Sequence, residues 1–109
     1  MKRRPAADEQ TASASLQALS RALAGLAKAE EVRAFLQDLC TPAELEAMAD
    51  RWRVVPLLVK GVPYREIHDL TEISVTTIGR VARTLESGTG GYASALRRQQ
   101  QSRSSAVSQ

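Results

Sequence analysis

Four residues in the C-terminal half of the chain have the types and spacing of a polar helical face. They occur at positions i, i+3, i+4 and i+7: Thr76, Gly79, Arg80 and Arg83. Arginine guanidinium groups bind phosphate and form paired hydrogen bonds with O6 and N7 of guanine. The hydroxyls of Thr76 and its neighbour Thr77 can donate to phosphate, and their methyl groups can contact the thymine methyl. A helix carrying these residues would present a face suited to double-stranded DNA.

The other reactive side chains are too few or too isolated to predict an enzyme. His68 is the only histidine and Cys40 the only cysteine, so the sequence offers neither a metal-ligand set nor an intrachain disulfide. No nucleophile–base pair, catalytic carboxylate pair or phosphate-binding glycine loop is recognisable. The glycines of segment 88–91 lie between two expected helices and indicate a linker. We therefore predict no catalytic residue, no metal and no cofactor.

Charge is unevenly distributed along the chain. The formal net charge is +3, yet six acidic residues lie between positions 30 and 50, and Glu86 is the only acid after position 73. Such polarity suits a polyanion on one side of the molecule. An ordinary solvated helical surface explains the charges equally well, so charge alone does not separate the two interpretations.

Apolar periodicity predicts an all-α fold. Leucines at positions 16, 19, 23 and 26 line one helical face, and apolar residues between 32 and 39 line a second. Pro42 suits the first position of a third helix, with Thr41 as its cap and Glu44 completing a capping box. This helix should end at Lys60–Gly61. Pro56 predicts a kink within it, because proline lacks the N–H that would bond to the previous turn.

The polar face belongs to the second of two short helices. Pro63 opens a helix over residues 64–70, residues 71–73 form a turn, and Ser74 caps a helix that runs to about residue 85. The residues expected to point inward from this last helix are Val75, Ile78, Val81, Ala82 and Leu85. The arrangement predicts a helix-turn-helix that binds DNA. A helical hairpin with a basic solvent face, used as a protein-interaction module, is the alternative.

The ends of the chain lack apolar periodicity. We expect a flexible arm over residues 1–13, one helical domain over 14–96 and a disordered basic tail over 97–109. The leucine stripe from Leu16 to Leu26 and the apolar stripe from Leu45 to Val59 offer more apolar surface than one small fold buries, which predicts a homodimer. No apolar run is long enough to cross a membrane and no secretory signal is present, so we expect a cytoplasmic, nucleoid-associated protein.

Several segments resemble the Trp-repressor-like family, in particular its YerC/YecD type. They are Phe35–Trp52, Tyr64–Ile67, Thr77–Arg83 and Gly90–Tyr92. The similarity extends over roughly residues 32–96. It implies an intertwined, all-helical homodimer whose helix-turn-helix binds a palindromic operator. It also implies a sequence-specific transcription regulator, for which repression by blocking a promoter is the simplest mechanism.

The resemblance extends the set of expected DNA-binding residues. Arg65 matches a base-contacting arginine of the family, and Tyr64 and His68 lie beside it. The tip of the reading helix matches Val75, Thr76, Thr77, Gly79 and Arg80. The chain departs from the usual family residues at four positions: Pro56, His68, Glu72 and Gly79. Glu72 stands where glycine is usual, so a positive φ is expected there.

The same resemblance suggests an effector site. In the Trp repressor two arginines hold tryptophan; they match Arg51 and Arg80, with a polar residue matching Thr41. Thr84 matches the residue that bonds the ligand amine. Val81 stands where that repressor has a glycine against the indole, and its side chain would intrude on a flat ring. We therefore expect either no effector or a small molecule other than tryptophan.

Overall fold

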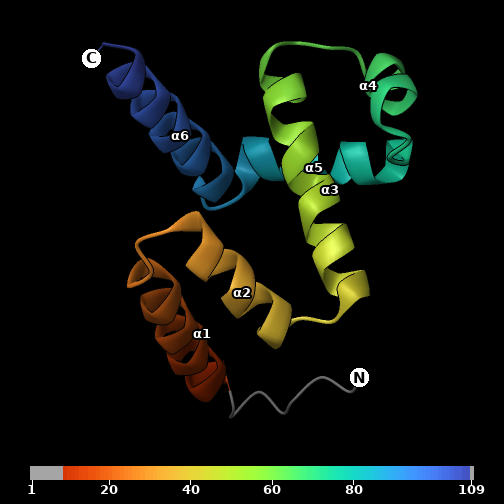
Figure 1. The fold of residues 1–109 in the computed structure, drawn as a ribbon. Helices are drawn as coiled ribbons and strands as arrows, with labels where there is room; N and C mark the ends of the chain where they lie inside the picture. Colours follow the sequence, from red (N-terminus) through yellow and green to blue (C-terminus); the bar gives the residue numbers. More distant parts are fainter. Residues whose placement is uncertain (1–8, 109) are drawn as a thin grey trace. The chain divides into compact units, whose positions relative to one another are not determined.

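The chain is helical throughout the part that the structure describes. A computed structural model describes residues 9–108, with side chains as far as residue 103. Over this range it contains the following helices and no strand: α1 (Glu9–Ala24), α2 (Ala29–Leu39), α3 (Pro42–Val59), α4 (Tyr64–Thr71), α5 (Val75–Ser87) and α6 (Gly91–Ser108) (Figure 1). The predicted all-α class is confirmed.

The helices divide into two compact units, with the boundary between Pro42 and Ala43. The first contains α1 and α2, and the second contains most of α3 together with α4, α5 and α6. The sequence predicted one domain over residues 14–96. That domain stays a prediction; within it, the boundary between the two units lies between the helices that carry the leucine stripe and those that carry the helix-turn-helix.

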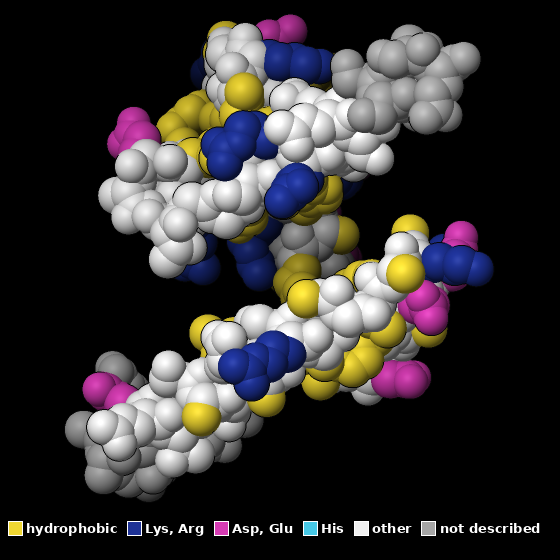
Figure 2. All heavy atoms as spheres, turned by 90° about the vertical axis from the view of Figure 1, so that its left-hand side faces the viewer, with side chains coloured by type: hydrophobic (Ala, Val, Ile, Leu, Met, Phe, Trp, Pro, Cys, Tyr) yellow, Lys and Arg dark blue, Asp and Glu magenta, His cyan; other side chains and the backbone are white. Residues whose placement is uncertain are grey.

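The first unit has no buried side chain among the residues of α1 and α2. Leu16 is 64% exposed and Leu39 is 51% exposed. Figure 2 shows the exposed apolar side chains in yellow along this unit, which is the elongated body at the bottom of the view. Two helices alone offer too little surface to enclose a core, so these apolar side chains stay exposed within the unit.

The start of α1 corrects the predicted N-terminal arm. Residues 9–13 are helical rather than flexible, and the rest of the predicted arm lies outside the described residues. Glu9 occupies the first turn, where a carboxylate interacts favourably with the helix dipole. Ala12 adds high helix propensity, which supports a helix even though the segment has no apolar stripe.

The second unit has its own hydrophobic core. The core cluster contains Val54 and Val55 from α3, Ile67 from α4, Ile73 from the turn, Ile78 and Val81 from α5, and Leu96 from α6. Trp52 and Tyr92 pack against this cluster, and their ring centroids are 6.5 Å apart. Every helix of the unit therefore contributes to the core that holds α4 and α5.

Helix α3 continues through Pro56 as one helix, as predicted, and ends at Val59. Its end is a Schellman motif: the N–H of Val62 donates to the Leu57 carbonyl, and that of Gly61 donates to the Leu58 carbonyl, each at 3.0 Å. Gly61 has a φ of 83°, the left-handed conformation that this motif requires and that glycine adopts without a steric penalty.

Helix α6 corrects the predicted C-terminal tail. It continues from Gly91 to Ser108, whereas we expected disorder from Arg97 onward. The segment is rich in arginine and glutamine, which have high helix propensity. Its residues can therefore continue the backbone hydrogen bonds of α6 without an apolar face that packs against another element. The prediction failed because it judged helix formation by packing alone.

Candidate nucleic-acid interface

Helices α4 and α5 pack against each other and are joined by a tight turn. Glu72 has a φ of 63°, the positive value expected at a position where the family usually has glycine. Its N–H donates to the His68 carbonyl at 2.8 Å. The Thr71 hydroxyl donates to the Ile67 carbonyl at 2.7 Å and accepts from the Ile73 N–H at 3.1 Å. The turn is thus held by side chains as well as by backbone.

Ser74 caps α5, as the sequence predicted. Its Oγ accepts the Thr77 backbone N–H at 3.1 Å and donates to the Thr77 Oγ1 at 3.0 Å. This cap sets the direction in which α5 leaves the turn and satisfies one N–H group of its first turn. Thr77, one of the expected DNA contacts, is half-buried and its hydroxyl serves the cap.

Most of the expected DNA-binding side chains lie on the surface. Tyr64 and Arg65 are exposed at the start of α4, and Thr76, Arg80 and Arg83 are exposed on α5. The structure therefore brings these residues onto two helices that pack together.

Val75 requires a correction. Periodicity placed it among the inward-pointing residues of α5, but it is 51% exposed. It is the first residue of the helix, where no preceding turn covers it, and Ile78 and Val81 fill the core instead. The exposure agrees with its other predicted place, at the tip of the reading helix.

His68 has a structural contact that sequence reasoning missed. Its Nδ1 lies 2.8 Å from the Ile73 carbonyl oxygen. A carbonyl oxygen only accepts, so Nδ1 carries the hydrogen and donates it. The ring, expected beside Arg65 as a DNA contact, thus links α4 to the turn before α5. The only available signal was the spacing of five residues, which is not distinctive.

Gly79 lies beside two of the expected contact residues. A Cβ at this position would be 3.6 Å from Nη1 of Arg83 and 4.0 Å from Cε2 of Tyr64, both ordinary contact distances. The sequence suggested that Gly79 permits close approach of backbone or DNA. Among the residues that the structure describes, no backbone atom of another element lies within 4 Å of this Cβ position, and the neighbours are the Arg83 guanidinium and the Tyr64 ring.

The expected effector residues are only partly brought together. Arg80 and Thr84 line a shallow hollow of about 470 Å³, together with Arg83, Ser87 and Gly88. Arg51 is half-buried on α3 and is not among the lining residues, while Thr41 belongs to the other unit.

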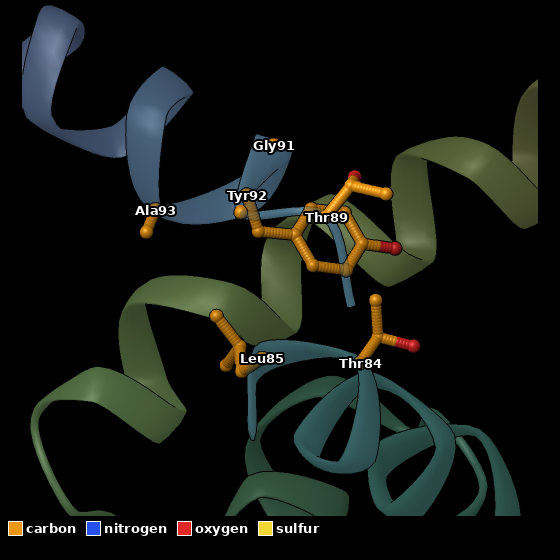
Figure 3. A pocket seen from close by; sticks show the side chains of 7 residues that line it. Thr84, Leu85, Thr89, Gly91, Tyr92 and Ala93 are labelled. Carbon is orange, nitrogen blue, oxygen red and sulfur yellow. The ribbon is translucent and has the colours of Figure 1, made fainter. Parts of the chain in front are cut away.

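A second hollow, of about 330 Å³, lies where α5 meets α6. It is lined by Thr84, Leu85, Thr89, Gly90, Gly91, Tyr92 and Ala93. Figure 3 shows the Tyr92 ring projecting from α6 across the space above Thr84 and Leu85. Its walls are mainly apolar, with threonine hydroxyls at one side, which are features of a small-ligand site.

Comparison with known proteins places these features in a family. The model of the Trp repressor protein family matches residues 14–100. The YerC protein of Bacillus subtilis (strain 168) is 37% identical over 83 residues, covering 76% of this chain and 80% of YerC. The crystal structure of a candidate Trp repressor from Staphylococcus aureus matches with a TM-score of 0.76 and 32% identity, covering 85% of this chain and 93% of that one. Among the described residues, no helix has the length and apolar character needed to cross a membrane.

Proposed function

Because the chain belongs to the Trp repressor family, a family of DNA-binding transcription regulators, we propose that it is a sequence-specific repressor that places α5 in the major groove. The observation that carries this proposal is the helix-turn-helix itself. Helix α5 begins with a Ser74 cap directly after a tight turn, and its first residues, Val75 and Thr76, are exposed. The first residues of a reading helix enter the groove deepest.

The interface combines two kinds of contact. Arg65 on α4 and Thr76 on α5 are assigned to base edges, where a guanidinium recognises guanine and a threonine methyl recognises thymine. Arg80 and Arg83 lie further along α5 and are assigned to the sugar–phosphate backbone, which fixes the position of the protein without reading sequence. Such a regulator would work in the cytoplasm, on the nucleoid.

We further propose an intertwined homodimer on a palindromic operator. The support is the first unit, whose helices carry exposed leucines and bury no side chain. A second copy would cover this surface and bring two helix-turn-helix elements into two-fold symmetry. Half-sites would then lie about 34 Å apart, or one helical turn of DNA.

Loss of a base-reading side chain should lower affinity for the operator selectively. Replacing Arg65 or Thr76 by alanine is expected to cost about 1–3 kcal/mol on the cognate duplex and little on a scrambled one. The operator is first selected from random duplexes with purified protein, and fluorescence anisotropy at several salt concentrations then measures both affinities.

Arg53→Ala is the matched control for this measurement. Arg53 is an exposed arginine on α3, outside the helix-turn-helix, and its Nη1 lies 4.0 Å from Oδ1 of Asp50. The substitution should change the affinity for either duplex only by the small effect of removing one positive charge. If wild-type protein binds no duplex, or if binding does not weaken with salt, the basic hairpin serves instead as a protein-interaction module.

The hollow between α5 and α6 favours a second role, as an effector-gated repressor. Its volume and apolar walls suit a small molecule with an apolar body, and Thr84 connects it with the expected effector residues. A thermal-shift panel of cellular metabolites, including tryptophan, should give one compound that raises Tm and changes operator affinity. Thr84→Val should remove that Tm shift, and a panel without any shift would rule the gating out.

A further inference from the structure

The space beside Gly79 determines where the charge of Arg83 lies. Arg83 follows Gly79 by four residues on α5, so it is one turn further from the helix tip. Its Nη1 nevertheless reaches to within 3.6 Å of the place where a Cβ of residue 79 would be. Helical side chains point toward the N-terminus of their helix, and a residue without a side chain at i−4 leaves that path open.

The same space is bordered by α4. Cε2 of Tyr64 lies 4.0 Å from that Cβ position, so a guanidinium from α5 and a phenol from α4 converge on one point. Tyr64 is 43% exposed and Arg83 is exposed, so both side chains also reach solvent. The two side chains that border this space each carry a hydrogen-bond donor, and that of Arg83 is cationic.

We infer that Gly79 positions its two neighbours: because no bulky side chain fills this space, Arg83 and Tyr64 can clamp a single phosphate of the DNA backbone, whatever the base sequence. The inference rests on the proposed function and refines it. A phosphate oxygen accepts bonds from several directions and attracts the guanidinium charge. Gly79 follows Val75 by four residues, or about one turn of α5, so the convergence point lies behind the first two residues of the helix, which enter the groove deepest; this favours a phosphate over a base edge.

The test measures the contribution of Arg83 in three backgrounds. Arg83→Ala in otherwise wild-type protein is expected to weaken cognate and scrambled duplexes equally, by roughly tenfold or more, and to lower the salt slope by about one unit per protomer. In a Gly79→Leu background, Arg83→Ala should cost little further affinity, since the leucine already occupies the place of the guanidinium. In a Gly79→Ala background the cost should be as in wild type, because a lone Cβ fits at ordinary contact distance.

A fourth variant addresses the phenol. Tyr64→Phe keeps the ring beside Gly79 and removes only the hydroxyl. It should weaken both duplexes in wild-type protein and have a smaller effect once Arg83 is alanine, as expected of two donors that share one phosphate. Ala and Leu both have higher helix propensity than Gly, so Tm should not fall in the Gly79 variants and a binding loss cannot be assigned to unfolding.

The outcomes separate the hypotheses. An equal cost of Arg83→Ala in all three backgrounds would overturn the role of Gly79, even while operator binding and the Arg65 effect persist. A loss confined to the cognate duplex would overturn the phosphate assignment in favour of a base contact. If wild-type protein binds no duplex, the proposed function is wrong, and this inference, which rests on it, is wrong as well.

Discussion

Ile78→Ala is expected to lower the free energy of unfolding of the second unit by about 2–5 kcal/mol. Ile78 is fully buried on α5 and belongs to the cluster that contains Val54 and Val55 of α3 and Ile67 of α4. Truncation removes apolar contacts and leaves a cavity that tightly packed neighbours fill only in part. Urea unfolding followed by circular dichroism measures the change.

Val75→Ala is the control for this experiment. It also shortens an apolar side chain of α5, but Val75 is half exposed and lies outside the core cluster. The free energy of unfolding of this variant should differ from that of the wild type by no more than about 0.5 kcal/mol. Comparable losses from the two variants would show that the tip of α5 is packed as tightly as its core face, contrary to the burial described above.

Leu16→Asp is expected to convert a dimer into a monomer. It should also weaken operator binding, by a factor at least as large as the factor by which it weakens the dimer. Leu16 is 64% exposed within the protomer, so the substitution removes little intramolecular packing. In a symmetric dimer it would place two charges in an apolar interface and remove two buried leucines, each worth about 1.5–3 kcal/mol. The dimer dissociation constant should rise roughly a hundredfold or more, as measured by light scattering over a concentration series.

Gln17→Asp introduces the same charge at the next residue, which faces another side of α1 and is exposed. It should leave the dimer intact. Leu39→Asp on α2 provides an independent variant, since Leu39 is 51% exposed. If wild-type protein is monomeric at micromolar concentration, or if neither leucine variant changes the mass, the first unit does not form the dimer interface.

Local chemistry explains which parts of the site could be predicted. A Ser74 cap, a left-handed residue at Glu72 and the ends of α3 depend on residues within a few positions of each other. The cap and the ends of α3 were predicted from neighbouring residues, whereas the left-handed conformation of Glu72 was expected from the family resemblance, because glycine is usual at that position. The outward face of Thr76, Arg80 and Arg83 follows from helical periodicity in the same way.

Other features depended on contacts that periodicity does not report. Val75 has the spacing of a core residue yet is exposed, since burial at a helix start depends on what packs above it. The helical extent of residues 97–108 depended on backbone hydrogen bonding rather than on an apolar stripe. The hydrogen bond from the His68 ring to the Ile73 carbonyl depends on the turn between α4 and α5, and the expected contact of this ring with DNA stays a prediction.

The sequence by itself determined the all-α class, the helix-turn-helix and the polarity of its outer face, because helical periodicity and caps are local and repeat over a few residues. Only the tertiary structure revealed that Gly79, Arg83 and Tyr64 meet at one point and that α1 and α2 bury no side chain. Both facts depend on how separate helices pack and which surfaces they leave open. That packing brings together residues distant in sequence, which no spacing within one helix can specify.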